Sequence, residues 1–301
     1  MKALQTEGNE AQILLVDNGS SDGSVLFMKE HYPEVDCICF TENRGFCEAV
    51  NAGIKAAKTP YVLLLNNDTE VFQNFVGNLE KAIEKSEKIF SVSSRMLVQQ
   101  QPQLLDGAGD LYCALGWAYS RLKGKDKEKA NKPCRIFAAC GGASLYRKSV
   151  FDEIGLFDTE HFAYLEDLDI GYRAKIYGYE NWYEPSAEVL HAGSGFSGSR
   201  YNEFKTRLSS RNSIYLIYKN MPFLQILLNI PFLLIGFFVK TLFFMRKGLG
   251  KIYVKGLLLG MQSAFKQKTK VHKVHFSVDN MENYCRIQLE LWINTIKRIC
   301  F

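Results

Sequence analysis

Two strand ends in this chain carry side chains that suit a phosphate-bearing ligand. Asp17 follows the apolar run Ile13 to Val16 and opens a loop rich in glycine and serine, where backbone amides can approach a ligand. Asn66-Asn67-Asp68 follows the apolar run Tyr61 to Leu65 in the same way. Because hard divalent cations prefer oxygen ligands and retain substrate phosphates, Asp68 is a candidate metal ligand; a turn or a helix N-cap is the alternative.

A third acidic segment suits proton transfer. Glu166, Asp167 and Asp169 fall in the first turns of an expected helix that runs to Tyr177. The positive end of a helix dipole favours ionised carboxylates, which a general base requires. We expect Asp169 to pair with Arg173 on the surface, and Glu166 or Asp167 to face a cleft. The alternative is that these are ordinary acidic residues at a helix N-terminus, with no role in proton transfer.

One histidine stands at another strand end. His191 follows the apolar pair Val189-Leu190 and precedes Ala192-Gly193-Ser194-Gly195, where glycines permit close approach to a ligand. The imidazole is a candidate metal ligand, and a purely structural role is the alternative.

These residues can form one site only in a fold that places several strand ends next to one another, and the pattern of the first hundred residues predicts such a fold. Short apolar runs alternate with helical patterns, which favours a doubly wound parallel sheet whose ligands collect beyond the carboxyl ends of the strands. The polar, lysine-rich stretch from Gln99 to Lys132 predicts an excursion or a mobile loop. The expected strands are 13–16, 35–40, 61–65 and 89–96, and the expected helices between them are 45–57 and 72–86, with a further helix ending near His31.

Charge divides the chain in two. Residues 1–199 contain 20 basic and 28 acidic residues, whereas residues 200–301 contain 17 and 4. The eight cysteines show neither zinc-site spacing nor a disulfide framework, which favours a reducing compartment. Met1 to Gln12 is polar and lacks the apolar core of a signal peptide, so we expect the catalytic body in the cytoplasm.

An uncharged apolar stretch runs from Pro222 to Val239 and is flanked by basic residues. Its length only just reaches that of a membrane span, and polar or helix-breaking residues interrupt it. A helix pair lying in the cytoplasmic membrane interface is therefore favoured over a spanning helix or a soluble core helix. Residues 278–301 predict a terminal amphipathic helix. No nucleic-acid-binding motif accompanies the positive charge, so anionic lipid is the favoured partner.

Six segments in order resemble glycosyltransferase family 2, in its rhamnosyltransferase-like and galactofuranosyltransferase-like branch. They are VDNGSSDGS, ENRGFCEAVNAGI, LLLNNDTEV, CGGASLYRKSVFDEIGLFD, LEDLDIGYRA and HAGSG, and the resemblance covers about residues 11–220. It implies a GT-A fold, which is a Rossmann-like and mostly parallel sheet with helices on both faces. It also implies inverting transfer from a nucleoside-diphosphate sugar. A dehydrogenase is disfavoured because no GxGxxG follows a candidate strand.

The resemblance also implies roles for individual residues. Asp167 would be the general base, with Glu166 and Asp169 assisting in its position. Asp68 and His191 would bind a divalent cation, Mg²⁺ or Mn²⁺. The residues expected at the nucleotide are Asp17, Asn43, Gly45, Asn67 and Asp68. Gly141 and Gly142 would line the acceptor cleft.

The chain is accordingly divided into a catalytic domain, residues 1–220, and an apolar, basic helical tail, residues 221–301. The expected partners are a UDP- or dTDP-sugar, a glycan or polyprenyl-diphosphate-linked acceptor, and the inner face of the cell membrane. Two departures from the family pattern stand out. Asn66 replaces the first aspartate of the DxD motif, and only twelve polar residues precede Ile13, where the family has an apolar strand and a helix. We therefore expect reduced or absent turnover, and the alternative function is a catalytically inactive nucleotide-sugar-binding or partner subunit.

Overall fold

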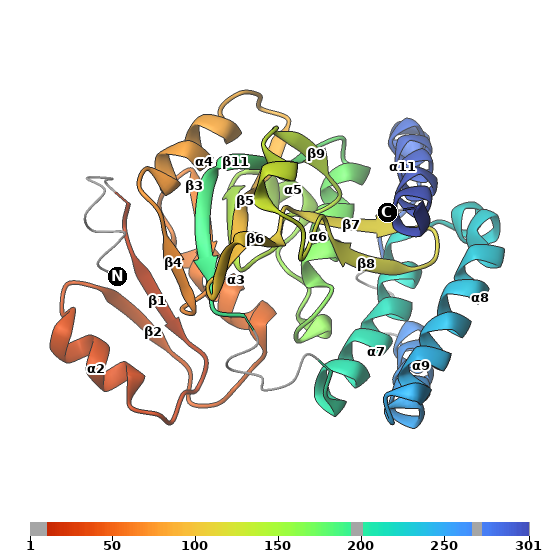
Figure 1. Ribbon diagram of the computed structural model, residues 1–301, viewed down its shortest axis with the longest axis horizontal. Coiled ribbons are helices and arrows are strands. Elements are labelled where there is room, and N and C mark those ends of the chain that lie inside the picture. Colours follow the sequence, from red (N-terminus) through yellow and green to blue (C-terminus); the bar gives the residue numbers. More distant parts are fainter. Residues whose placement is uncertain (1–10, 194–200, 267–272, 301) are drawn as a thin grey trace.

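The computed structural model describes residues 11–193, 201–266 and 273–300 (Figure 1). Residues 1–10 and Ser194-Gly195, both named in the sequence analysis, lie outside the described residues. The strands are β1 Leu14–Asp17, β2 Asp36–Cys39, β3 Tyr61–Leu65, β4 Thr69–Val71, β5 Ile89–Val98, β6 Gln101–Gly107, β7 Asp110–Cys113, β8 Trp117–Ser120, β9 Cys134–Ile136, β10 Ala143–Arg147 and β11 Glu180–His191. The α-helices are α2 Ser24–His31, α3 Phe46–Ala56, α4 Phe75–Ile83, α5 Val150–Ile154, α6 Glu166–Ile176, α7 Glu203–Asn220, α8 Phe223–Arg246, α9 Gly250–Phe265 and α11 Met281–Cys300. Short 3-10 helices are η1 Lys127–Ala130, η2 Thr159–His161 and η3 Val278–Asn280.

The central sheet has seven strands and is mixed rather than mostly parallel. Its order is β3-β10-β5-β11-β4, with β6 on β5 and β9 on β11. β11 runs parallel to β5, whereas β10 is antiparallel to both β3 and β5, and β4 is antiparallel to β11. The strand–helix alternation predicted parallel pairing because a crossover helix returns the chain in the same direction. β4 and β10 instead enter the sheet through loops that reverse the chain.

Helices cover both faces of this sheet, as predicted. On one face α4 packs against alternate residues of β5, β10 and β11 through Phe75, Leu79 and Ile83. On the other face Phe90, Tyr146 and Tyr183 pack against α3, α5 and α6. Because side chains alternate along a strand, neighbouring apolar residues of β5 serve opposite faces, which explains why this strand is buried nearly throughout.

The stretch from Gln99 to Lys132 is ordered, so the prediction of a mobile loop was wrong. It forms β6, the β7–β8 hairpin and η1. Leu105, Tyr112 and Cys113 are almost fully buried, whereas the lysines of the segment lie mainly at the surface. The prediction followed the lysine-rich composition and overlooked short apolar runs, whose residues form part of the core.

A two-stranded parallel sheet, β1–β2, stands beside the main sheet with α2 and α3 (Figure 1). Among the described residues, β1 pairs only with β2, and Leu14 to Val16 remain partly exposed. All eight cysteines are free thiols.

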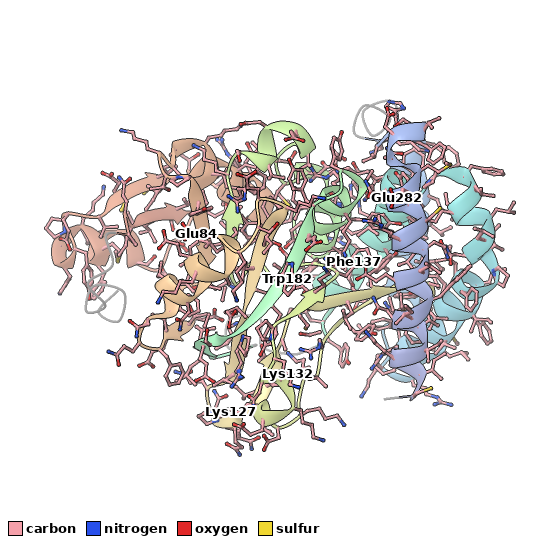
Figure 2. All side chains as sticks on the ribbon, turned by 90° about the horizontal axis from the view of Figure 1, so that it is seen from above. Glu84, Lys127, Lys132, Phe137, Trp182 and Glu282 are labelled. Atoms are coloured by element: carbon pink, nitrogen blue, oxygen red, sulfur yellow. The ribbon has the colours of Figure 1, made fainter. Side chains whose placement is uncertain are left out.

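Helices α7, α8, α9 and α11 form a layer at one end of the molecule (Figures 1 and 2). α9 packs extensively against α7, and α11 packs against β7 and α6. Leu216, Leu233 and Leu291 join these helices to β7 and α6 through one apolar cluster with Tyr112 and Tyr172. Within the described part of the chain, α8 is the one helix whose length and hydropathy would suffice to cross a membrane.

Candidate active site

Two predicted metal ligands meet at one edge of the sheet. His191 Nε2 lies 3.4 Å from Asp68 Oδ2, and the backbone amide of Ala192 donates a 2.9 Å hydrogen bond to the Asp68 carbonyl. The register explains this meeting, because β11 is antiparallel to β4 and pairs His191 with Thr69, the residue after Asp68. The fold therefore brings together two side chains that are 123 positions apart in the chain.

A third residue, Asp106 at the end of β6, orients the histidine. Its Oδ2 lies 2.8 Å from His191 Nδ1, so a ring proton on Nδ1 is donated to Asp106 and Nε2 faces Asp68. Burial alone would raise the pKa of Asp106, but hydrogen bonds from His191 and Lys123 outweigh burial and lower this pKa to about 2. The same hydrogen bond is the main cause of the raised pKa of His191.

This arrangement fits a divalent cation. Asp68 Oδ1 is buried and has no hydrogen-bond partner among the described residues, and a buried carboxylate oxygen of this kind needs a compensating cation or donor. A carboxylate that accepts the second ring hydrogen of a ligating histidine is a common feature of metal sites. Oxygen and imidazole donors suit Mg²⁺ or Mn²⁺ completed by phosphate oxygens.

Another cluster with metal-ligand atoms, Asp158, His161 and Asp169, already contains its cation. Lys219 Nζ lies 2.7 Å from Asp158 and 2.8 Å from Asp169, and Arg173 lies 2.9 Å from Asp169. Burial alone would raise the pKa of Asp169, but the charges of Arg173 and Lys219 outweigh it and hold this pKa well below its usual range. The cluster is a buried ion network that joins α6 to α7.

Asp169 does pair with Arg173, but the expectation of a surface pair was wrong. The Asp169 side chain is fully buried because α7 covers this side of α6, and Asn220 donates a further 2.8 Å hydrogen bond to it. Asp169 therefore contacts its own helix and α7 and fixes how α6 is placed.

Asp167, the candidate base, faces the glycine pair that precedes β10. A Cβ atom on Gly141 would lie 2.8 Å from Asp167 Oδ1, and one on Gly142 would lie 3.2 Å from the Asn66 side chain. Because β10 is antiparallel to β3, its first residue lies opposite Leu65, and the Asn66 amide donates a 2.9 Å hydrogen bond to the Gly142 carbonyl. The glycines thus sit between the base and the strand end that leads to Asp68.

Asp167 is surrounded by like charge. Burial, together with the charges of Glu166 and Asp110, raises the pKa of Asp167 well above its usual range, and its Oδ1 has no hydrogen-bond partner among the described residues. Burial also raises the pKa of Glu166 to about 7 and that of Asp110 to about 6. A carboxylate with a raised pKa is the kind of group that can accept a proton from a hydroxyl near neutral pH.

The loop before α6 is strained. Phe162, Tyr164 and Leu165 all have positive φ angles, between 60° and 69°, which non-glycine residues adopt at a cost of about 1–3 kcal/mol each. Asn212 of α7 is fully buried and donates hydrogen bonds of 2.8–2.9 Å to the carbonyls of His161, Ala163 and Tyr164. α7 therefore holds the loop that sets the position of Asp167.

The predicted nucleotide residues form a second group that contacts the first. Asp17 Oδ2 accepts hydrogen bonds from the amides of Gly19 and Ser20, and Asn18 bonds to Asn43 and to the Gly45 carbonyl. Gly45, with φ 89°, lies so close to Phe162 that a Cβ there would be 2.7 Å from the ring. Phe46 in turn touches the Gly141 position. A chain of contacts thus connects Asp17 to Asp167, while Asn67 is exposed beside Asp68.

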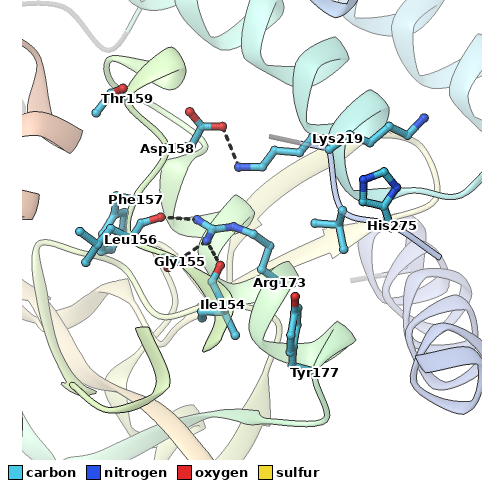
Figure 3. A pocket seen from close by; sticks show the side chains of 12 residues that line it. Ile154, Gly155, Leu156, Phe157, Asp158, Thr159, Arg173, Tyr177, Lys219 and His275 are labelled. Carbon is cyan, nitrogen blue, oxygen red and sulfur yellow. Dashed lines mark hydrogen bonds and ion pairs between the residues drawn. The ribbon is translucent and has the colours of Figure 1, made fainter. Parts of the chain in front are cut away.

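A cavity of about 460 Å³ lies apart from these residues, beside α6 and residues 273–275 (Figure 3). Arg173 bonds there to the carbonyls of Ile154, Gly155 and Leu156, and Lys219 bonds to Asp158. Asp17, Asp68, Asp167 and His191 do not line it. The cavity is bounded by the buried ion network rather than by the candidate catalytic groups.

Sequence reasoning missed Asp106 and Asp110, which lie close to the predicted residues. A signal was present, because Asp106 follows the apolar pair Leu104-Leu105 and glycines separate the two aspartates. The same strand-end pattern had selected Asp17 and Asp68. It was overlooked because the lysines nearby favoured a loop.

The fold is shared with a solved glycosyltransferase structure. The crystal structure of GalNAc-T7 with UDP, GalNAc and Mn²⁺ superposes with a TM-score of 0.56 at 18% sequence identity, covering 71% of this chain and 43% of that one. The mixed sheet flanked by helices therefore has the GT-A fold. Residues 2–155 match the sequence profile of glycosyl transferase family 2, and the chain belongs to that family.

Two curated relatives agree with this assignment. The chain is 28% identical over 215 residues to the N-acetylglucosaminyl-diphospho-decaprenol L-rhamnosyltransferase of Mycobacterium tuberculosis, covering 63% of this chain and 68% of the relative. It is 26% identical over 188 residues to the poly-beta-1,6-N-acetyl-D-glucosamine synthase of Staphylococcus epidermidis, covering 61% of this chain but only 43% of the synthase. The protein is therefore a glycosyltransferase that uses a nucleotide sugar.

Proposed function

We propose that this protein transfers one sugar, with inversion at the anomeric carbon, from a UDP- or dTDP-sugar to a polyprenyl-diphosphate-linked or glycan acceptor. Residues 1–220 would form the catalytic domain, working at the cytoplasmic face of the membrane, with residues 221–301 as its membrane-associated tail. The observation that carries the proposal is the position of Asp167 against Gly141, one residue before the glycine that contacts Asn66 of the Asn66-Asn67-Asp68 segment. The named activity of the mycobacterial relative supports the choice of acceptor class.

Each group has a defined task in such a transfer. Asp17 is held by two backbone amides through Oδ2, which presents Oδ1 to a nucleobase, with Asn43 and Gly45 beside the nucleotide. Asp68 and His191 would hold the divalent cation, which would supply positive charge next to the diphosphate of the donor. Gly141 and Gly142 leave room for the acceptor sugar because neither carries a side chain.

Asp167 Oδ1 accepts the proton of the acceptor hydroxyl. That oxygen is free of protein hydrogen-bond partners among the described residues, so an acceptor hydroxyl can donate to it without displacing one. Glu166 and Asp110 keep the proton affinity of Asp167 high, and Asp169 fixes the helix that carries it. An acid with raised pKa returns the proton to solvent once product leaves.

The test compares transfer and donor binding in one pair of variants. Asp167→Asn should lower the turnover number about 10²- to 10⁴-fold while leaving the affinity for the UDP- or dTDP-sugar with Mn²⁺ within about twofold. The control is Asp152→Asn, an exposed carboxylate of α5, which should change neither quantity. Transfer that persists in Asp167→Asn would exclude Asp167 as the base.

A second candidate is a nucleotide-sugar-binding subunit without turnover. Within the described residues β1 and β2 form a sheet of their own, and β1 does not pair with β3 of the main sheet. This separation favours the inactive subunit, because Asp17 at the end of β1 is then not fixed to the main sheet by strand pairing. Calorimetry with UDP- and dTDP-sugars detects binding under either proposal. Product formation that Asp167→Asn abolishes supports only the enzyme.

A further inference from the structure

Helix α8 has its polarity reversed relative to a helix in a water-soluble protein. Its buried residues are Gln225, Asn229, Leu233, Gly236 and Phe244. The first four recur every three to four residues along one side, and three of these four are polar or small. A soluble amphipathic helix buries its apolar side instead. The exposed large apolar side chains of α8 are Phe223, Leu224, Leu227, Leu228, Ile230, Phe232, Leu234, Ile235, Phe238, Val239, Leu242, Phe243 and Met245.

The inward side of α8 contacts other elements of the protein along its whole length. Gln225 accepts a 2.7 Å hydrogen bond from Tyr172, and Asn229 exchanges two hydrogen bonds with Gln288. Further along, Trp117 donates a 3.0 Å hydrogen bond to the Gly236 carbonyl. At the far end Phe244 stacks on Tyr253 of α9, with ring centroids 4.8 Å apart.

These contacts decide between a span and a surface orientation. The 24 residues of α8 extend about 36 Å, which is enough to cross a bilayer. A spanning α8 would carry into the hydrocarbon the β7–β8 hairpin and α11, which contact its middle. Those elements carry charged side chains, for which the hydrocarbon is costly.

Helix α9 repeats the same arrangement beside α8. A Cβ atom on Gly256 would lie 1.8 Å from the Ser210 hydroxyl, and one on Gly260 would lie 2.5 Å from the Arg211 carbonyl, so these glycines allow α9 to pack closely on α7. The opposite side of α9 exposes the large apolar residues Val254, Leu258, Met261 and Phe265. α8 lies at the outer edge of the molecule, with side chains projecting outward (Figures 1 and 2).

Charge identifies the occupant of this surface. Residues 223–265 contain five basic residues and no acidic one. Arg246, Lys247, Lys251 and Lys255 are exposed between and beside the apolar rows of α8 and α9. An apolar surface on two helices that carry basic residues and no acidic one matches a bilayer with anionic headgroups, because the side chains enter the acyl boundary while the cations stay among the phosphates.

We propose that α8 and α9 together lie flat in the interface of an anionic lipid bilayer, with the whole length of α8 parallel to the membrane plane. This inference deepens the membrane location in the proposed function. Its test measures no sugar transfer, so the two proposals can fail separately.

Flotation of the purified full chain with vesicles tests the surface. Vesicles of phosphatidylcholine with phosphatidylglycerol should bind the chain, and combined Leu227→Ser, Leu234→Ser and Phe238→Ser should weaken this binding at least about tenfold. These three side chains are 50%, 67% and 64% exposed, so their replacement should leave the fold intact. The matched control, Leu26→Ser with Phe72→Ser, removes exposed apolar side chains elsewhere and should bind as the unmodified chain does.

The role of charge and the orientation need two further measurements. Lys247→Glu with Lys251→Glu should reduce binding to phosphatidylglycerol vesicles and remove most of its salt dependence. For orientation, Phe223→Cys and Lys247→Cys mark the two ends of α8 in a chain whose exposed Cys39, Cys285 and Cys300 are replaced by serine. A membrane-impermeant maleimide added outside sealed vesicles should label both positions.

Three results would overturn the proposal. Protection of one end of α8 would mean that the helix spans the bilayer. Equal vesicle binding by the triple serine variant and the unmodified chain would remove this surface from membrane contact. An oligomer that binds no vesicles and dissociates in the triple variant would identify a second copy of the chain as the occupant.

Discussion

Replacing Asp110 by asparagine should lower the pKa of Asp167 by about one to two units. The carboxylate oxygens of these residues lie within 4.8 Å of each other, and the charge of Asp110 is one of the causes of the raised pKa of Asp167. At 4.8 Å two unit charges repel by about 3.5 kcal/mol at an effective dielectric constant of about 20, and by about 0.9 kcal/mol in water. At about 1.36 kcal/mol per pKa unit, these limits correspond to roughly 0.6 and 2.5 units.

The sign follows from the repulsion between the two carboxylates. Burial raises the pKa of Asp110 to about 6, and the charge of ionised Asp110 is one of the causes of the raised pKa of Asp167. Removing the charge of Asp110 stabilises ionised Asp167, and a base must be ionised to accept a proton. The acid limb of the pH–rate profile should therefore move to lower pH. Glu166→Gln should act in the same direction and more strongly, because the charge of Glu166 raises the pKa of Asp167 more than the charge of Asp110 does.

Carboxyl ¹³C NMR of aspartate-labelled protein measures this pKa without substrate. The Asp167 resonance is assigned by its disappearance in Asp167→Asn, and chelator keeps the sample free of divalent cations. Glu87→Gln, which removes one exposed charge between α4 and β5, is the control and should leave the titration unchanged. A shift below about 0.3 units in Asp110→Asn would refute the assignment of like-charge repulsion at this site.

Three other substitutions test separate parts of the structure. Asp106→Asn should weaken Mn²⁺ binding about 10- to 100-fold in calorimetry, because His191 loses the carboxylate that orients it; an unchanged affinity would mean that the metal is held elsewhere. Lys219→Met should lower the free energy of unfolding by about 3–5 kcal/mol in urea, because buried Asp158 loses its cation and buried Asp169 loses one of its two, whereas Arg286→Met at the exposed pair with Glu282 should cost under about 1 kcal/mol. Gly236→Ala should destabilise the protein by about 1–3 kcal/mol in thermal unfolding, since its methyl group would lie 2.1 Å from a carbonyl oxygen of the β7–β8 turn; an unaltered melting temperature would contradict the close contact of α8 with that turn.

Local patterns predicted many of the elements and the candidate residues. The expected strand 61–65 and the structure's β3 have the same bounds, and the expected helix 45–57 differs from α3 only at its ends. The expected helix 72–86 was too long, because β4 and a turn precede α4. Apolar periodicity identified these segments because it reports which side of an element is buried, and burial is a local requirement.

The direction of the strands in the sheet could not be predicted from apolar periodicity. β10 enters between β3 and β5 in the antiparallel direction, and this reversal brings Gly141 and Gly142 beside Asn66. No residue spacing encodes that pairing, since it depends on contacts between β10 and strands from distant parts of the chain.

The sequence by itself determined which strand ends carry carboxylates, where the apolar tail begins, and that its charge is basic. Only the tertiary structure decided that Asp106 orients His191, that Asp169 is buried by α7, and that α8 turns its polar side inward. The physical reason is that composition and periodicity act over a few residues along the chain. Burial, ion pairing and the pKa of a carboxylate depend instead on neighbours brought from distant segments.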